Sequence, residues 1–272
     1  MASGSFPKSP LLLIPLLVLV LVVPSCRKGG QEPPASAVLY SMRHQEKSVG
    51  QESNTSDGRG ATISLEYPEV TGPHQVRDSL NAAIRAVLLD QPPAGSASDG
   101  IDSVIAAFLA EYQEFVSATP EYSTRWYDRR LMHVVTDTLG VFSLALEVDT
   151  YQGGAHPNRR VRYVNFDATT GRQMAGFFGN GRNDSLLARA ERAFRSVRGM
   201  PSGESFQGAG FWFENDMFAL PNNALITPTG IRFYYNSYEV APYVMGPTEF
   251  ELPFLSLSDI LPPTSPLSVF VR

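Results

Sequence analysis

Hydrophobic and polar residues alternate in several stretches of the chain, and this two-residue period predicts strands. In residues 61–68 apolar side chains alternate with polar ones until Pro68 ends the run. The same period continues through residues 125–152, where an Asp-Thr-Leu-Gly turn separates two strands, and through residues 159–167. Further strand-like runs are predicted at residues 210–214, 224–228, 230–236 and 248–254.

A period of about 3.6 residues predicts three helices, at residues 74–90, 101–117 and 184–199. Asp184 is expected to cap the third helix and Gly199 to end it. Strands and helices occur in separate runs instead of alternating regularly. This order predicts an α+β fold of two packed lobes, with antiparallel sheets that carry helices on one face.

The N-terminal region has the pattern of a targeting signal. Lys8 precedes an apolar run at residues 11–23, which is shorter than the ~20 residues that a helix needs to cross a bilayer. We therefore predict a lipoprotein signal peptide in residues 1–25. Cys26 is the only cysteine and follows Ser25 directly, as in a bacterial lipobox, although Pro24 is unusual there.

Lipidation of Cys26 predicts a protein of the cell envelope that is anchored in a membrane, on the periplasmic or outer-membrane side if the cell is Gram-negative. The alternative is a free thiol behind an uncleaved anchor. With one cysteine, the chain has no structural disulfide, so its folded part depends on its core.

Composition divides the rest of the chain. Residues 26–60 are rich in Gly, Ser, Pro, Gln and Glu, which predicts a flexible tether. We predict an N-terminal α+β lobe in residues 61–150, a C-terminal sheet-rich lobe in residues 151–262 and a tail in residues 263–272.

The formal net charge of −5 argues against nucleic-acid binding. Metal-ligand, nucleophile-elbow and phosphate-loop motifs are absent from the sequence, so we expect neither a cofactor nor a metal.

The segment Tyr-Gln-Gly-Gly-Ala-His-Pro-Asn-Arg-Arg, residues 151–160, concentrates candidate chemistry. Gly153 and Gly154 permit positive φ, and the proline after His156 restricts that histidine to extended geometry. In one interpretation, an anionic or sugar-like group binds to four side chains of this loop, namely Tyr151, His156, Asn158 and Arg159. In the other, His156 hydrogen-bonds a neighbouring carbonyl and fixes the connection between two strands.

A second candidate is the tyrosine-rich segment of residues 235–247. Its Tyr238, Glu239 and Tyr243 could grip a protein or a sugar, since rigid tyrosines lose little entropy on binding. The alternative is that these tyrosines cover one end of a sheet. The aromatic run of residues 211–213 is predicted to contribute core on one face and a groove or an edge on the other.

Three segments resemble a known family: Tyr-Gln-Gly-Gly-Ala-His-Pro-Asn, the following Val-Asn-Phe-Asp-Ala-Thr-Thr-Gly-Arg, and the run from Ala224 to Phe254. The chain from about residue 61 to 261 is similar to the extracytoplasmic domains of unknown function found in the anti-sigma factor RsiV and before the catalytic part of the peptidoglycan deacetylase PdaC. The resemblance implies an N-terminal α+β lobe and a C-terminal sheet-rich lobe. In RsiV such a domain is a receptor for lysozyme, and in PdaC it accompanies a separate catalytic domain.

These observations predict a lipid-anchored, non-enzymatic binding protein whose partner is a lysozyme-like protein or peptidoglycan. Two alternatives remain. One is an envelope hydrolase, acting on carbohydrate or ester groups, that uses His156 as acid or base. The other is a purely structural envelope module.

Overall fold

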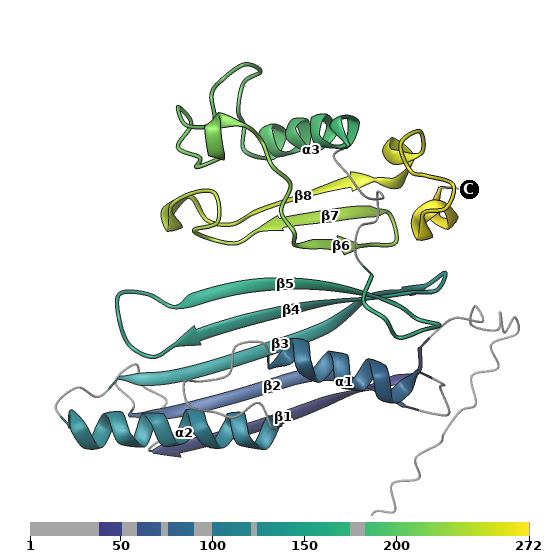
Figure 1. Ribbon diagram of the computed structural model, residues 1–272. Coiled ribbons are helices and arrows are strands. Elements are labelled where there is room, and N and C mark those ends of the chain that lie inside the picture. The colour runs from purple at the N-terminus through teal and green to yellow at the C-terminus, as the bar shows by residue number, and fades with distance from the viewer. Residues whose placement is uncertain are drawn as a thin grey trace, which may run out of the picture. The chain divides into compact units, whose positions relative to one another are not determined.

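The computed structural model describes residues 38–50, 59–71, 76–89, 100–120, 124–174 and 183–271 (Figure 1). The predicted signal peptide and Cys26 lie outside these residues. Within these residues, two sheets and three α-helices make up an α+β fold, which confirms the predicted class. No helix among the described residues is long and apolar enough to cross a membrane.

The first sheet has five strands in the order β1-β2-β3-β4-β5. They are β1 Tyr40–Gly50, β2 Gly60–Val70, β3 Arg125–Thr138, β4 Val141–Tyr151 and β5 Asn158–Asp167. Neighbours are antiparallel except β2 and β3, which are parallel. The parallel pair arises because two helices connect these strands, which gives the chain the length needed for a crossover.

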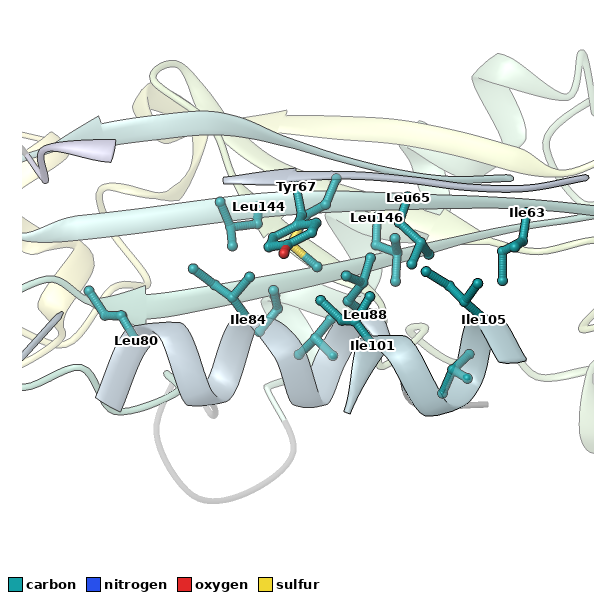
Figure 2. Close-up of a cluster of buried hydrophobic side chains, with 14 of the residues drawn as sticks. Ile63, Leu65, Tyr67, Leu80, Ile84, Leu88, Ile101, Ile105, Leu144 and Leu146 are labelled. Atoms are coloured by element: carbon teal, nitrogen blue, oxygen red, sulfur yellow. The ribbon is translucent and has the colours of Figure 1, made fainter. Parts of the chain in front are cut away.

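Helices α1 (Arg77–Leu88) and α2 (Ile101–Ala118) form the core of the first lobe with this sheet. Leu80, Ile84 and Leu88 share one stripe of α1, and in Figure 2 they point toward sheet side chains such as Leu65 and Leu144. All five are buried. Burial of a side chain of this size stabilises the fold by roughly 1.5–3 kcal/mol, so this stripe holds α1 on the sheet.

The prediction of a flexible tether over residues 26–60 was wrong for residues 40–50, which form strand β1. Residues 40–50 pair with β2 along the whole length of both strands, although most β1 side chains are exposed. A strand at the edge of a sheet is held by backbone hydrogen bonds and is often polar, so its composition resembles that of a linker. The chain is also fixed just before β1, where the Val38 amide donates to the Asp137 carboxylate at 2.9 Å.

The second sheet is antiparallel, with the order β6-β7-β8. Its strands are β6 Ala224–Ile226, β7 Gly230–Tyr235 and β8 Thr248–Pro253, and helix α3 (Asp184–Val197) packs against β8. Phe194 of α3 is fully buried and lies at the centre of an aromatic core. Its ring contacts those of Phe206, Phe211, Phe213, Phe218, Tyr235 and Phe250.

Three expectations about this lobe were wrong in detail. The helix cap is Asn183, whose side chain accepts from the Leu186 amide, and not Asp184. Residues 210–214 lie close to the core without forming a strand. The predicted tail of residues 263–272 includes a 3₁₀ turn, Pro266–Phe270, whose Leu267 is fully buried in the second core.

The predicted lobe boundary at residue 150 falls inside the first sheet, because β5 pairs with β4. The alternating pattern of residues 158–167 continues the meander of β3 and β4, so the second lobe begins only after it. Side-chain amides join the lobes at this point. Asn223 accepts from the Tyr163 amide at 2.7 Å and donates to the Val161 carbonyl at 2.8 Å, in the manner of a neighbouring strand.

Candidate functional site

The loop between β4 and β5 has a fixed shape. Gly153 and Gly154 adopt φ angles of 93° and 107°, a region that disfavours residues with a Cβ. The hydroxyl of Tyr151 donates to the carbonyl of Gly154 at 3.0 Å and closes the turn. These three candidate residues therefore shape the loop, and the ring of Tyr151 packs against Tyr127 on β3.

His156 at the end of this loop stacks on Tyr243, with ring centroids 3.9 Å apart and an interplanar angle of 16°. Its Nδ1 lies 2.8 Å from the carbonyl oxygen of Pro157. Because a carbonyl only accepts, Nδ1 carries the proton and donates it. The hydroxyl of Tyr243 donates to the same carbonyl at 3.4 Å. The two loops that the sequence singled out separately therefore meet.

The second loop, residues 236–247, is held in shape by a short turn. Tyr238 has a φ of 69°, and its amide donates to the carbonyl of Ala241 at 3.2 Å. Its ring lies 5.7 Å from that of Tyr243. Tyr238 is 55% exposed and Val244 is 90% exposed. We call His156, Tyr238, Tyr243 and Val244 the aromatic patch.

Asn236 anchors the second loop to the first lobe. Its Oδ1 accepts from the amide of Val161 at 2.7 Å, and its Nδ2 donates to the carbonyl of Val161 at 3.1 Å and to Glu239 at 3.0 Å. Arg198, just after α3, donates to the carbonyl of Met245 at 2.9 Å. The aromatic patch thus stands on a loop held from both lobes.

A hollow of about 470 Å³ adjoins the aromatic patch, and we call it the arginine hollow. It is lined by Arg159, Tyr234, Ser237, Tyr243, Val244, Met245, Gly246 and Pro247. Arg159 is ion-paired with Glu147 of β4. The hydrogen bond and the charge of Glu147 raise the pKa of Arg159. Burial raises the pKa of Tyr234, so both groups are hydrogen-bond donors at neutral pH.

A second hollow, of about 400 Å³, borders the same loop, and we call it the tryptophan hollow. It is lined by Trp212, Phe213, Glu214, Ala219, Leu220, Pro221, Asn222, Asn223, Tyr235, Glu239 and Val240. Volumes of this size are typical of small-ligand sites. Loop 236–247 contributes residues to both hollows.

The structure brings together His156, Tyr238 and Tyr243 among the predicted site residues. Arg159 lines the arginine hollow, whereas Glu239 lines the tryptophan hollow. Asn158 is exposed, and its carbonyl accepts from the Thr150 hydroxyl at 3.4 Å. Cys26 lies outside the described residues.

Trp212, Glu214 and Asn222 were not predicted as site residues. The only sequence signal was the aromatic triplet of residues 211–213, in which Phe211 and Phe213 are buried and Trp212 is exposed. Neither Glu214 nor Asn222 carries a local pattern that distinguishes it from a surface residue. In the part of the chain that the structure describes, no three His, Cys, Asp or Glu residues gather as metal ligands.

Comparison with known proteins identifies a domain of unknown function. Residues 177–254 match a family described as "Protein of unknown function (DUF3298)". The chain has no match among curated proteins. The matched region includes loop 236–247 and strands β6, β7 and β8 of the second sheet.

Two solved structures share the fold. A DUF3298 family member from Bacteroides fragilis superimposes with a TM-score of 0.67 at 18% identity, covering 88% of this chain and 99% of that one. A DUF3298 family protein from Pseudomonas aeruginosa gives a TM-score of 0.58 at 15% identity, with 84% and 97% covered. The shared fold therefore extends well beyond residues 177–254.

Proposed function

We propose that this chain is a lipid-anchored, non-enzymatic binding protein of the bacterial cell envelope, and that the aromatic patch holds its partner. The observation that carries the proposal is the stacking of His156 on Tyr243, which joins the two candidate loops into one exposed surface. The preferred partner is a lysozyme-like protein, and the alternative is peptidoglycan.

The composition of the patch supports protein binding. Tyrosine offers a large and rigid contact area at low entropic cost, and it is enriched among the residues that dominate binding energies. Val244, which is 90% exposed, adds an apolar side chain directly after Tyr243 in the chain. Exposed apolar groups that cluster in this way are typical of interaction sites.

The contacts of His156 favour binding over hydrolysis. A general acid or base needs a proton path to substrate and is commonly oriented by a carboxylate or hydroxyl. The His156 ring instead stacks on Tyr243 and donates from Nδ1 to the Pro157 carbonyl. Within the described residues, no carboxylate lies within hydrogen-bond distance of the ring. Both contacts belong to an architectural role in the loop.

The choice of partner rests on the resemblance to the RsiV and PdaC domains. In RsiV the similar domain is a receptor for lysozyme, which supports a lysozyme-like partner here. In PdaC it accompanies a peptidoglycan-modifying domain, which supports the cell wall as the alternative. The Bacteroides and Pseudomonas structures support the fold of the domain and say nothing of its ligand.

Replacing Tyr243 with alanine should weaken partner binding at least tenfold, about 1.4 kcal/mol, because the substitution removes a patch ring and the support of His156. The Tyr243→Phe variant keeps the ring and should bind nearly as well as the wild type. Binding is measured by calorimetry between the detergent-purified full chain and either lysozyme or soluble peptidoglycan fragments.

Tyr40 provides a matched control for this experiment. It is 40% exposed, against 37% for Tyr243, and lies on β1. The Tyr40→Ala variant should therefore bind like the wild type. Unchanged binding by Tyr243→Ala would exclude the patch, and absence of wild-type binding to both ligands would exclude the proposed partners.

The lipid anchor is tested separately. Replacing Cys26 with alanine should release the protein from membranes and abolish labelling by a fatty-acid probe, since the thiol is the acceptor of the lipid. Fractionation and in-gel detection of the probe measure both effects. The Ser36→Ala variant, altered in the predicted tether, should remain labelled and membrane-bound. Persistent labelling of the Cys26→Ala protein would contradict the proposed anchor.

A further inference from the structure

The tryptophan hollow combines an exposed indole with an open, partly polar lining. Trp212 is 54% exposed, although the flanking Phe211 and Phe213 are buried in the second core. Because both neighbours are core residues, the backbone that carries this indole is fixed. The backbone amide of Trp212 also donates to the carbonyl of Val240 at 2.8 Å, which ties this segment to the opposite side of the lining.

Two glutamates line the same hollow. Glu214 precedes Asn215 and Asp216, which have φ angles of 53° and 58°. Asp216 accepts from the Gln207 amide at 2.7 Å, which fixes this bend. The second, Glu239, directly follows Tyr238 of the aromatic patch.

The lining has an unbalanced charge. Glu214 and Glu239 both contribute carboxylates, and the lining contains no lysine or arginine. One oxygen of Glu239 accepts from Asn236, whereas the carboxylate of Glu214 has no hydrogen-bond or ion-pair partner among the described residues. Closing a ligand over two ionised carboxylates is costly unless the ligand brings positive charge.

We propose that the tryptophan hollow receives an arginine side chain of the protein partner, with the guanidinium stacked on Trp212 and donating to Glu214 and Glu239. The inference rests on the proposed function, because it assigns a chemical class to the partner of the same loop. Glu239 follows Tyr238, so one partner surface can cover the patch and reach the hollow.

Arginine suits this lining better than other groups. Its planar guanidinium stacks on aromatic rings, carries donors that match carboxylates, and is less strongly hydrated than the ammonium of lysine. An anionic ligand would be repelled by both carboxylates. A neutral sugar could stack on Trp212 but would leave the two charges uncompensated, so the charge of the lining favours the cation.

The two tryptophans of the chain allow a direct test. The full chain is labelled with ¹⁵N-tryptophan in detergent and titrated with N-acetyl-L-arginine amide. The indole N–H signal of Trp212, assigned with Trp212→Phe, should shift saturably with a midpoint on the order of 1 mM, as expected for a ligand of this size. Trp126 is buried in the first lobe and should not shift.

The isosteric citrulline derivative lacks the charge and should produce no saturable shift. The Glu214→Gln/Glu239→Gln variant should bind the arginine probe at least tenfold more weakly. The Glu204→Gln variant removes one carboxylate charge, from an exposed residue outside the lining, and should bind the arginine probe normally.

Two outcomes would overturn the inference. In one, N-acetylglucosamine oligomers shift the Trp212 signal and the arginine probe does not, so the hollow is a sugar site. In the other, neither probe shifts it. This titration needs no protein partner, so its result is independent of the Tyr243→Ala experiment. The tryptophan hollow can prove not to bind arginine while the aromatic patch binds its partner, and the aromatic patch can prove not to bind while the hollow takes the arginine probe.

Discussion

Replacing Arg130 with methionine is expected to lower the free energy of unfolding by about 3–5 kcal/mol, because it leaves the buried carboxylate of Asp128 without its cationic partner. Arg130 lies beside Asp128 on β3, and both side chains are 5% exposed. The guanidinium donates to Asp128 from Nε at 3.0 Å and from Nη2 at 2.7 Å. It also donates to the Leu88 carbonyl at 2.8 Å, at the C-terminal end of α1.

Urea denaturation measures the effect, followed by the fluorescence of Trp126 in a Trp212→Phe background. Trp126 suits this purpose because its ring packs against Phe108 and Tyr112 of α2 in the same lobe. The matched variant Arg130→Met/Asp128→Leu removes both charges and should recover most of the loss. If the single and double variants are equally destabilised, the lost energy comes from packing and not from the stranded charge.

The elements with strong periodicity could be predicted from the sequence. Helix α1 has an apolar stripe and β3 alternates, because each buries one face against the core. The apolar residues of β4 also alternate in the sequence, although residues 141–146 are all buried because this strand lies between the two lobes. Strand β1 could not be predicted, since its backbone pairing at the sheet edge places few demands on side chains. The burial of Leu267 could not be predicted either, because whether a short turn packs against the core depends on which part of the core surface the rest of the chain leaves exposed.

The candidate site, too, could be predicted only in part. The glycines of loop 151–158 and the tyrosines of loop 236–247 could be identified, since backbone conformation and residue type are local properties. The stacking of His156 on Tyr243 could not, because it joins two lobes and depends on their packing. The tryptophan hollow was hidden for the same reason, as Trp212 and Glu239 come from segments joined only in the fold.

Three asparagines hold the two lobes in register, and the site depends on them. Asn223 and Asn236 pair with the backbone of β5, which places loop 236–247 beside loop 151–158. Asn165 on β5 makes the corresponding contact with β6. Each carboxamide both donates and accepts, as a backbone peptide does. The two lobes are thus joined by hydrogen bonds to strand backbone, as neighbouring strands of a sheet are, and every one of these buried polar groups needs a partner.

Replacing the buried Asn165 with leucine should therefore lower the free energy of unfolding by about 3 kcal/mol or more, since each buried polar group left without a partner costs about 1–3 kcal/mol. Asn165 accepts from the Ser143 hydroxyl and from the Ile226 amide, and donates to the Ala224 carbonyl, each at 2.8 Å. Leucine has the same branched shape and the same number of side-chain heavy atoms, so the substitution removes all three hydrogen bonds without leaving a cavity.

The indole N–H signals of the two tryptophans, followed in urea, report the two lobes separately. The Asn165→Leu variant should lose the Trp212 signal at a lower urea concentration than the wild type, because β6 and its sheet lose their attachment to β5. The Ser143→Ala variant removes one of the three bonds and should cost about 1 kcal/mol. A loss below that value in Asn165→Leu would mean that apolar packing, and not this carboxamide, holds the second lobe against the first.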